Sequence, residues 1–300
     1  MVDTMSGSSA GHGGSKSTPA SAQYGAHAEV DSPIRRLLVL LVSIALAAIA
    51  FRAVLPFFGS ARGVAGPTVG DADRPIFAAV AIVLAFAVTT AIAALVGKLV
   101  NAIVGIFVLG TGVAYLAMRS GGSADFCFGD SSVVAAGVEL VGWTALVAAG
   151  SHVVFRVGGP LVDFPKTNED HIDSPVGPRA RAAWLAALAG LAIAWLAAVT
   201  ASKGQALGAA TLAGFATGAF GRMLSPRTPP IYLASAPIAA FALVYLIIGL
   251  TGALDLSTAY VEGTLPRFLR LMPVDIAAGA LCGTALGFGF TRSFAAPAHE

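Results

Sequence analysis

Charged residues are scarce in this chain. They make up 11% of its 300 residues, against about 25% in a typical soluble domain. Hydrophobic residues reach 56% and the mean hydropathy is +0.81, so the composition is that of a membrane protein. The net charge is only +2, and the lysines and arginines do not gather on one face. We therefore expect no nucleic-acid partner, because neutralising phosphates needs clustered positive charge.

Residue patterns that carry catalytic chemistry are lacking as well. The two cysteines lie far apart, Cys127 in a connecting loop and Cys282 inside an apolar run, so we expect two free thiols. The sequence has no nucleotide-binding loop, no nucleophile motif and no metal-ligand spacing. We predict no catalytic residue, no cofactor and no metal site. The sequence favours a protein that is not an enzyme.

One polar segment holds side chains of the kinds that ligate metals. Carboxylates and an imidazole can bind a divalent cation. The segment lacks the alternating acidic order, the central glycine and the terminal glutamate of a calcium-binding loop. We interpret it as a solvated acidic loop. The residues concerned are Asp163, Glu169, Asp170, His171 and Asp173.

Long apolar runs dominate what the chain does contain. Eight stretches of roughly 17 to 23 residues are almost free of charge, and each can cross the ~30 Å hydrocarbon core of a bilayer as one helix. The sequence predicts an all-α polytopic membrane helix bundle with about eight transmembrane helices, and a count of seven stays open. The predicted spans are Leu37–Phe58, Ile76–Val96, Ala102–Met118, Ser132–Phe155, Ala182–Thr200, Gly204–Leu224, Ile231–Leu250 and Pro273–Phe290.

Polar segments divide the chain into five parts. Residues 1–31 are rich in Gly, Ser, Ala and His and have almost no large apolar side chains, so we expect a disordered tail. Spans one to four form a membrane half at 32–155, and spans five to eight form a second half at 182–292. A linker loop, 156–181, separates the halves, and 293–300 form a short tail. Whether the halves are a structural repeat stays open.

The distribution of positive charge predicts the orientation in the membrane. With the amino terminus inside, the 18 lysines and arginines divide into eleven on the inner side and seven on the outer side. Inner loops carry the excess in most membrane proteins. We therefore expect both termini and the linker loop to face the cytoplasm, in the cytoplasmic membrane of a bacterium or archaeon.

Three ionisable residues inside or at the edge of the spans are candidates for a functional site. A charged side chain in the hydrocarbon costs about 2.5 kcal/mol or more unless it is paired or faces water. Glu139, Arg52 and Asp275 all fall in the outer third of the membrane on the predicted topology. Arg52 could therefore pair with either carboxylate. Arg52 can also extend to the interface, and Asp275 complements a helix dipole, whereas Glu139 has no such structural explanation.

Small residues recur every fourth position in two of the spans. Gly279, Gly283 and Gly287 do so in the eighth span, and Gly214 and Gly218 follow Ala210 in the sixth. This spacing is typical of helices that cross closely in membranes. We interpret both rows as packing faces. They contact each other, a second copy of the chain in a homo-oligomer, or another membrane subunit.

These observations lead to two functional hypotheses for a multi-pass protein embedded in the lipid bilayer. The first is a permease-like or channel-like protein for a small solute or ion, with Glu139 at its site. The alternative is a non-transporting membrane scaffold or assembly subunit. A cavity reaching Glu139 favours the permease. A dry interior packed with glycine favours the scaffold.

Overall fold

The computed structural model describes residues 33–60, 63–159, 177–226, 228–252 and 254–291. The chain divides into two units, Met1–Leu37 and Leu38–Glu300. In the first unit the described residues are the five that begin the first long helix. The predicted tails 1–31 and 293–300 lie outside the described residues. So do Asp163, Glu169, Asp170, His171 and Asp173 of the acidic loop.

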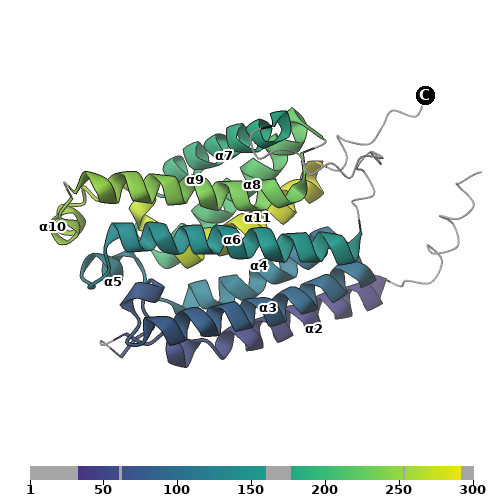
Figure 1. The fold of residues 1–300 in the computed structure, drawn as a ribbon, viewed down its shortest axis with the longest axis horizontal. Helices are drawn as coiled ribbons and strands as arrows, with labels where there is room; N and C mark the ends of the chain where they lie inside the picture. Colours follow the sequence, from purple (N-terminus) through teal and green to yellow (C-terminus); the bar gives the residue numbers. More distant parts are fainter. Residues whose placement is uncertain (1–32, 61–62, 160–176, 227, 253, 292–300) are drawn as a thin grey trace, which may run out of the picture. The chain divides into compact units, whose positions relative to one another are not determined.

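Eight long helices make up most of the described residues, and the predicted all-α helix bundle is confirmed (Figure 1). The described residues contain no β-strand, only an isolated bridge between Gly59 and Ala65. The helices are α2 (Pro33–Arg52), α3 (Pro75–Leu99), α4 (Ala102–Arg119), α6 (Val133–Gly158), α7 (Pro178–Ala197), α8 (Lys203–Leu224), α9 (Pro230–Thr251) and α11 (Pro273–Thr291).

The helix ends differ most from the predicted spans at the first helix and on either side of the linker. The first helix ends at Arg52 instead of Phe58, and a 3₁₀ turn, η1 (Leu55–Phe57), follows it with a proline inside. Proline removes a backbone donor and stops the α-helix there. The polar linker is also shorter than 156–181, because α6 continues to Gly158 and α7 begins at Pro178.

Short elements lie in the connections at one end of the bundle. They are α5 (Ser123–Cys127), α10 (Leu256–Val261), η2 (Val69–Asp71) and η3 (Arg267–Arg270). Asp255 caps α10 by accepting hydrogen bonds from Ser257 and Thr258, and these bonds lower the pKa of its carboxyl group. The sequence did not predict these elements, because each is too short to show a hydrophobic period.

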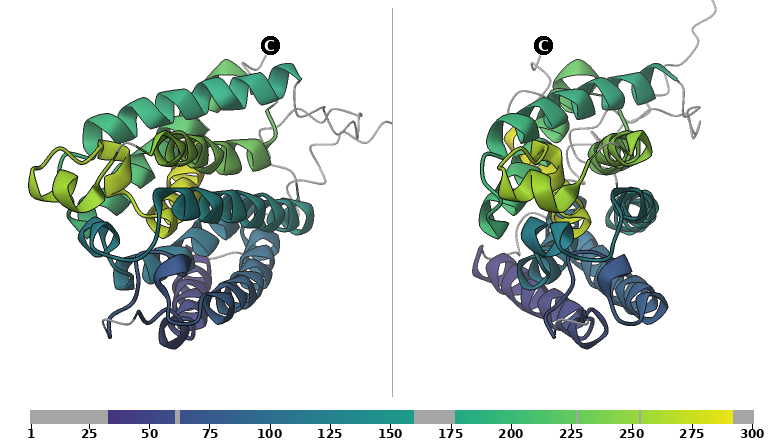
Figure 2. Two further views of the ribbon diagram at one scale, coloured as in Figure 1. Left: turned by 60° about the vertical axis from the view of Figure 1, so that its left-hand side comes forward. Right: turned by 90° about the vertical axis from the view of Figure 1, so that its left-hand side faces the viewer.

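Helix α11 lies inside the bundle. It contacts α4, α6, α8 and α9 (yellow in Figure 2), and most of its residues are buried. Its small side chains allow this position, since Ala and Gly let four neighbours approach one helix closely. The two halves on either side of the linker therefore pack into each other within the second unit, instead of standing apart.

Seven of the described long helices are apolar enough to cross a membrane, which indicates a multi-pass membrane protein. Helix α8 is the exception, because glycine, threonine and Arg222 lower its hydropathy. It nevertheless runs parallel to α11 along the length of that helix. Lys203 at its start lies 2.9 Å from Asp275, and Arg222 near its end donates to the carbonyl of Phe288 at 3.3 Å. A membrane crossed by α11 is therefore crossed by α8 as well.

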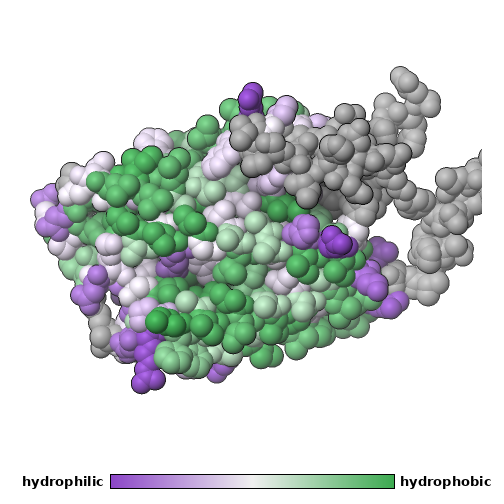
Figure 3. Space-filling view, viewed as in Figure 1, coloured by the Kyte–Doolittle hydropathy of each residue, from purple (hydrophilic) through white to green (hydrophobic). Residues whose placement is uncertain are grey.

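The outer surface of the helices is apolar over most of its length. Large side chains such as Leu41, Val83, Leu188 and Ile247 are about half exposed. Figure 3 shows hydrophobic residues over the middle of one face and hydrophilic residues gathered at its two ends. Soluble proteins rarely expose so large an apolar surface. The distribution is the one expected for contact with lipid.

The predicted orientation leads to a labelling result. A cysteine at Glu262, exposed between α10 and η3, should react with a membrane-impermeant maleimide added to intact cells. A cysteine at Ser225, between α8 and α9, should react only after the cells are opened. In both variants the native Cys282 is replaced by alanine, so that it does not react with the maleimide. Cys127 will not compete, because it is buried and burial raises the pKa of its thiol to about 11. The reverse labelling pattern would invert the topology.

Candidate functional site

Glu139 lies near the start of α6, where its carboxylate accepts two hydrogen bonds. The backbone N–H of Val69 donates to Oε2 at 2.8 Å, and the indole Nε1 of Trp143 donates to Oε1 at 3.2 Å. Trp143 is one helical turn further along α6, and Val69 belongs to η2. The side chain of Glu139 is partly buried. Both oxygens are therefore held by donors, and the position of the carboxylate is defined.

The segment that supplies Val69 is itself tied to the start of α6. The hydroxyl of Thr68 donates to Asp71 Oδ2 at 2.7 Å, and the backbone N–H of Ser131 donates to Asp71 Oδ1 at 3.2 Å. Gly70 packs so closely that a Cβ there would lie 2.6 Å from Ser131 Oγ. Glycine at this position lets the loop reach Glu139.

A cavity of about 370 Å³ reaches Glu139 from the side of the bundle. Its walls come from α3 and α6 and are almost entirely apolar. Among the described residues that line it, Glu139 is the only ionisable one. Val83 and Val138 form part of its rim and are 47% and 60% exposed, so the cavity opens on the lipid-facing surface. Its other lining residues include Ala79, Ile82, Gly142, Trp143 and Leu146.

A second pocket, of about 220 Å³, lies in the connections beyond the helix ends. Four aspartates line it, Asp71, Asp73, Asp125 and Asp130, and none of its described lining residues is Lys or Arg. Gly70 lines this acidic pocket and also the cavity at Glu139. Both spaces therefore border the η2 segment at Gly70. We call them the acidic pocket and the Glu139 cavity.

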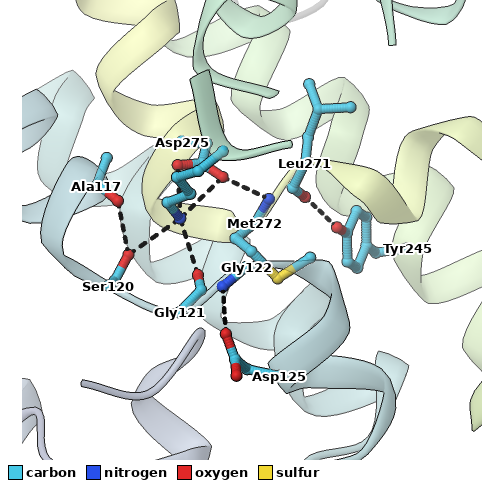
Figure 4. A network of polar contacts seen from close by, with 10 residues as sticks. Ala117, Ser120, Gly121, Gly122, Asp125, Tyr245, Leu271, Met272 and Asp275 are labelled. Atoms are coloured by element: carbon cyan, nitrogen blue, oxygen red, sulfur yellow. Dashed lines mark hydrogen bonds and ion pairs between the residues drawn. The ribbon is translucent and has the colours of Figure 1, made fainter. Parts of the chain in front are cut away.

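Asp275 belongs to a different polar cluster, which joins three helix ends (Figure 4). Its carboxylate is fully buried; Lys203 Nζ lies 2.9 Å from Oδ1 and 3.2 Å from Oδ2. Lys203 also donates to Ser120 Oγ at 3.1 Å and to the carbonyl of Gly121 at 2.9 Å. The backbone N–H of Met272 donates to Asp275 Oδ2 at 3.0 Å. The cluster fastens the end of α4 to the starts of α8 and α11.

The three ionisable candidates thus lie apart. Arg52 is exposed at the end of α2, and in the described part of the chain no ion pair joins it to Glu139 or Asp275. Neither pairing that the sequence allowed for Arg52 is present among these residues, and Lys203 is the partner of Asp275. The sequence analysis did not single out Lys203. The available signal was that it precedes a predicted span on the same side of the membrane as Asp275.

The glycine rows of α8 and α11 face each other. A Cβ at Gly214 would lie 2.6 Å from the carbonyl oxygen of Gly279, and one at Gly218 would lie 2.9 Å from that of Thr284. Gly283 and Gly287 in turn meet the backbone of α8 at Thr211 and Phe215. Contact between these two rows is one of the alternatives that the sequence left open. The backbones are too close to admit any side chain.

Comparison of the chain with protein-family models, with curated proteins and with solved structures finds no match.

Proposed function

We propose that this chain is a permease-like protein of the cytoplasmic membrane that takes a small cationic solute at Glu139. The observation that carries the proposal is the position of this carboxylate. It lines an apolar cavity between α3 and α6, and Gly70 of that cavity also lines the acidic pocket in the connections. An ionisable group held at such a place is costly, and proteins retain these groups chiefly along solute or proton paths.

The electrostatics of the entrance support a cation as the solute. Four carboxylates surround the acidic pocket without a lysine or arginine among its described lining residues. A pocket lined by one sign of charge raises the local concentration of the opposite ion. The solute would exchange its hydration for the Glu139 carboxylate. On the predicted topology this pocket faces the outside of the cell.

A scaffold or assembly subunit is the second candidate, and the interface of α8 and α11 favours it. Backbone meets backbone there, so this part of the interior has no room for a solute path. The permease fits better overall, since the Glu139 cavity lies away from this interface, between α3 and α6. In a scaffold the carboxylate would serve only to hold Val69 and Trp143, and that role needs no cavity beside it.

The test is the flux of small cations into vesicles reconstituted with the protein. Glu139→Gln keeps the shape of the side chain and removes its charge. We expect it to lower the flux of methylamine, ammonium or a metal cation by about tenfold or more, the equivalent of at least 1.4 kcal/mol of lost interaction. Glu262→Gln removes an exposed charge outside the cavity and should leave the flux unchanged.

Folding is checked in parallel by the unfolding midpoint of each variant in detergent. A wild-type protein that moves none of these cations would overturn the permease in favour of the scaffold. So would an unchanged flux in Glu139→Gln.

A further inference from the structure

The Glu139 cavity continues along the bundle as a groove. A neighbouring cavity of about 330 Å³ shares Val83 and Leu146 with it and runs on between α3 and α6 to Val153. Its walls are apolar and include Phe86, Ala87 and Ala149. We call the two cavities together the α3–α6 groove; the Glu139 cavity is its upper part and the cavity that reaches Val153 is its lower part. At 1.5 Å per residue, the fourteen residues from Glu139 to Val153 span about 21 Å of α6.

This length suits a hydrocarbon chain. One leaflet of the hydrocarbon core is about 15 Å thick, half of the ~30 Å total. A groove of about 21 Å can therefore hold an alkyl tail along its full length. The rim is open to lipid at Val83 and Val138, so a tail can enter sideways without crossing the packed interior.

A polar group part-way along the groove indicates a ligand more specific than a bulk lipid tail. Thr90 is 7% exposed and lines the lower cavity, and its hydroxyl has no hydrogen-bond partner among the described residues. It lies level with Gly150, where a Cβ would be 3.1 Å from Thr90 Oγ1. That level is about 16 Å beyond Glu139 along α6. A hydroxyl left unpaired in an apolar environment is costly, so a polar atom of the occupant would stabilise it.

The upper end of the groove selects the charge of the head group. Glu139 lies there, and Gly70 joins the groove to the acidic pocket with its four aspartates. An anionic head group would be repelled, whereas an ammonium group would be attracted. The side chains of Asp73 and Asp130 are exposed and make no hydrogen bond or ion pair within the described part of the chain.

We propose that the α3–α6 groove binds a long-chain amine. The ammonium head lies between Glu139 and the acidic pocket, the alkyl tail follows the groove, and a hydroxyl or ester on the tail meets Thr90. This inference rests on the proposed function, because it names the class of cationic solute that the site takes. It also explains why a cation site opens toward lipid.

Trp143 provides a reporter inside the groove. The chain has three tryptophans, and replacing Trp184 and Trp195 on α7 by phenylalanine leaves Trp143 alone, where it packs against Phe86 of the lower cavity. The probes are alkyl chains brominated midway, which quench indole fluorescence at short range. We expect a brominated long-chain amine to quench Trp143 at concentrations about tenfold lower than the carboxylic acid of equal length, a difference of about 1.4 kcal/mol.

Three variants test the parts of the proposal. Asp73→Asn with Asp130→Asn should remove most of the preference for amine over acid. Ala149→Leu places a larger side chain in the lower groove and should weaken quenching by the long amine several-fold. Ala145→Leu, one turn away on α6 and outside the lining, should not. If an amine with a mid-chain hydroxyl quenches Trp143 at lower concentration than an amine with a plain tail, Thr90→Val should abolish that difference.

The outcomes separate this inference from the proposed function. Equal quenching by amine and acid, unaffected by Ala149→Leu, would show ordinary lipid contact and overturn the inference. Methylamine flux that depends on Glu139 would then still support a permease for small cations. If the wild-type protein shows neither methylamine flux nor a preference for amine over acid, both proposals are overturned.

Discussion

Gly283→Ala is expected to lower the free energy of unfolding by about 2 kcal/mol, within the range of 1–3 kcal/mol for overpacked sites. The added methyl group would meet the carbonyl oxygen of Thr211, the N–H of Phe215 and the backbone of Gly214 on α8. These are main-chain atoms, so no side-chain rotation can make room. The two helices must move apart, and the contacts along their whole interface weaken together. The measurement is reversible unfolding in mixed micelles with increasing denaturing detergent.

Gly289→Ala is the matched control. It makes the same change in the same helix, at an exposed position where an added Cβ meets nothing within 4 Å. Alanine favours a helix over glycine by up to about 1 kcal/mol, so this variant should unfold at the same point as the wild type or later. Equal destabilisation in both variants would mean that close contact of α8 and α11 contributes nothing to stability.

Lys203→Met is expected to cost about 3 kcal/mol or more, the range found when one partner of a buried ion pair is removed. Asp275 is fully buried, and methionine would leave its carboxylate with only the N–H of Met272. Ser120 and Gly121 would also lose the donor that joins α4 to α8. Unfolding in detergent should show the loss directly.

The double variant Lys203→Met with Asp275→Asn distinguishes the loss of an attraction from the cost of an unpaired buried charge. Asparagine still accepts a hydrogen bond from the N–H of Met272, and it is uncharged. We expect it to recover at least half of the stability that Lys203→Met loses. If the double variant is as unstable as the sum of the two single variants, the carboxylate and the ammonium act independently, and the cluster is not an ion pair in energetic terms.

The membrane architecture could be predicted from the sequence because lipid imposes a length and a composition on every span. Helix ends agree closely where proline or a capping side chain marks them. Pro75 and Pro230 occupy first turns, and Asn101 and Ser132 accept hydrogen bonds from the backbone of α4 and α6. The end of the first helix was misplaced, since the apolar run continues through the 3₁₀ turn Leu55–Phe57, and the start of α7 was placed at Ala182 instead of Pro178.

The partners of the polar residues could be predicted only in part. Trp143 is four residues after Glu139, so helical spacing alone brings the two together. The other donor to Glu139 is the backbone N–H of Val69. Nearly every residue has such a group, so the residue type does not identify the donor. Lys203 and Asp275 are 72 residues apart and meet because α8 and α11 run parallel. That contact depends on which helices are neighbours. The spacing of residues within one helix does not give this information.

The composition of α8 bears on the order in which the bundle is assembled. A segment so rich in glycine and threonine, with an arginine near its end, gains little from entering lipid alone. Its partner α11 is synthesised later, after α9 and α10 have left the ribosome. We expect α8 to stay at the translocon or against α7 until α11 arrives, and the membrane integration of one helix then depends on the synthesis of another.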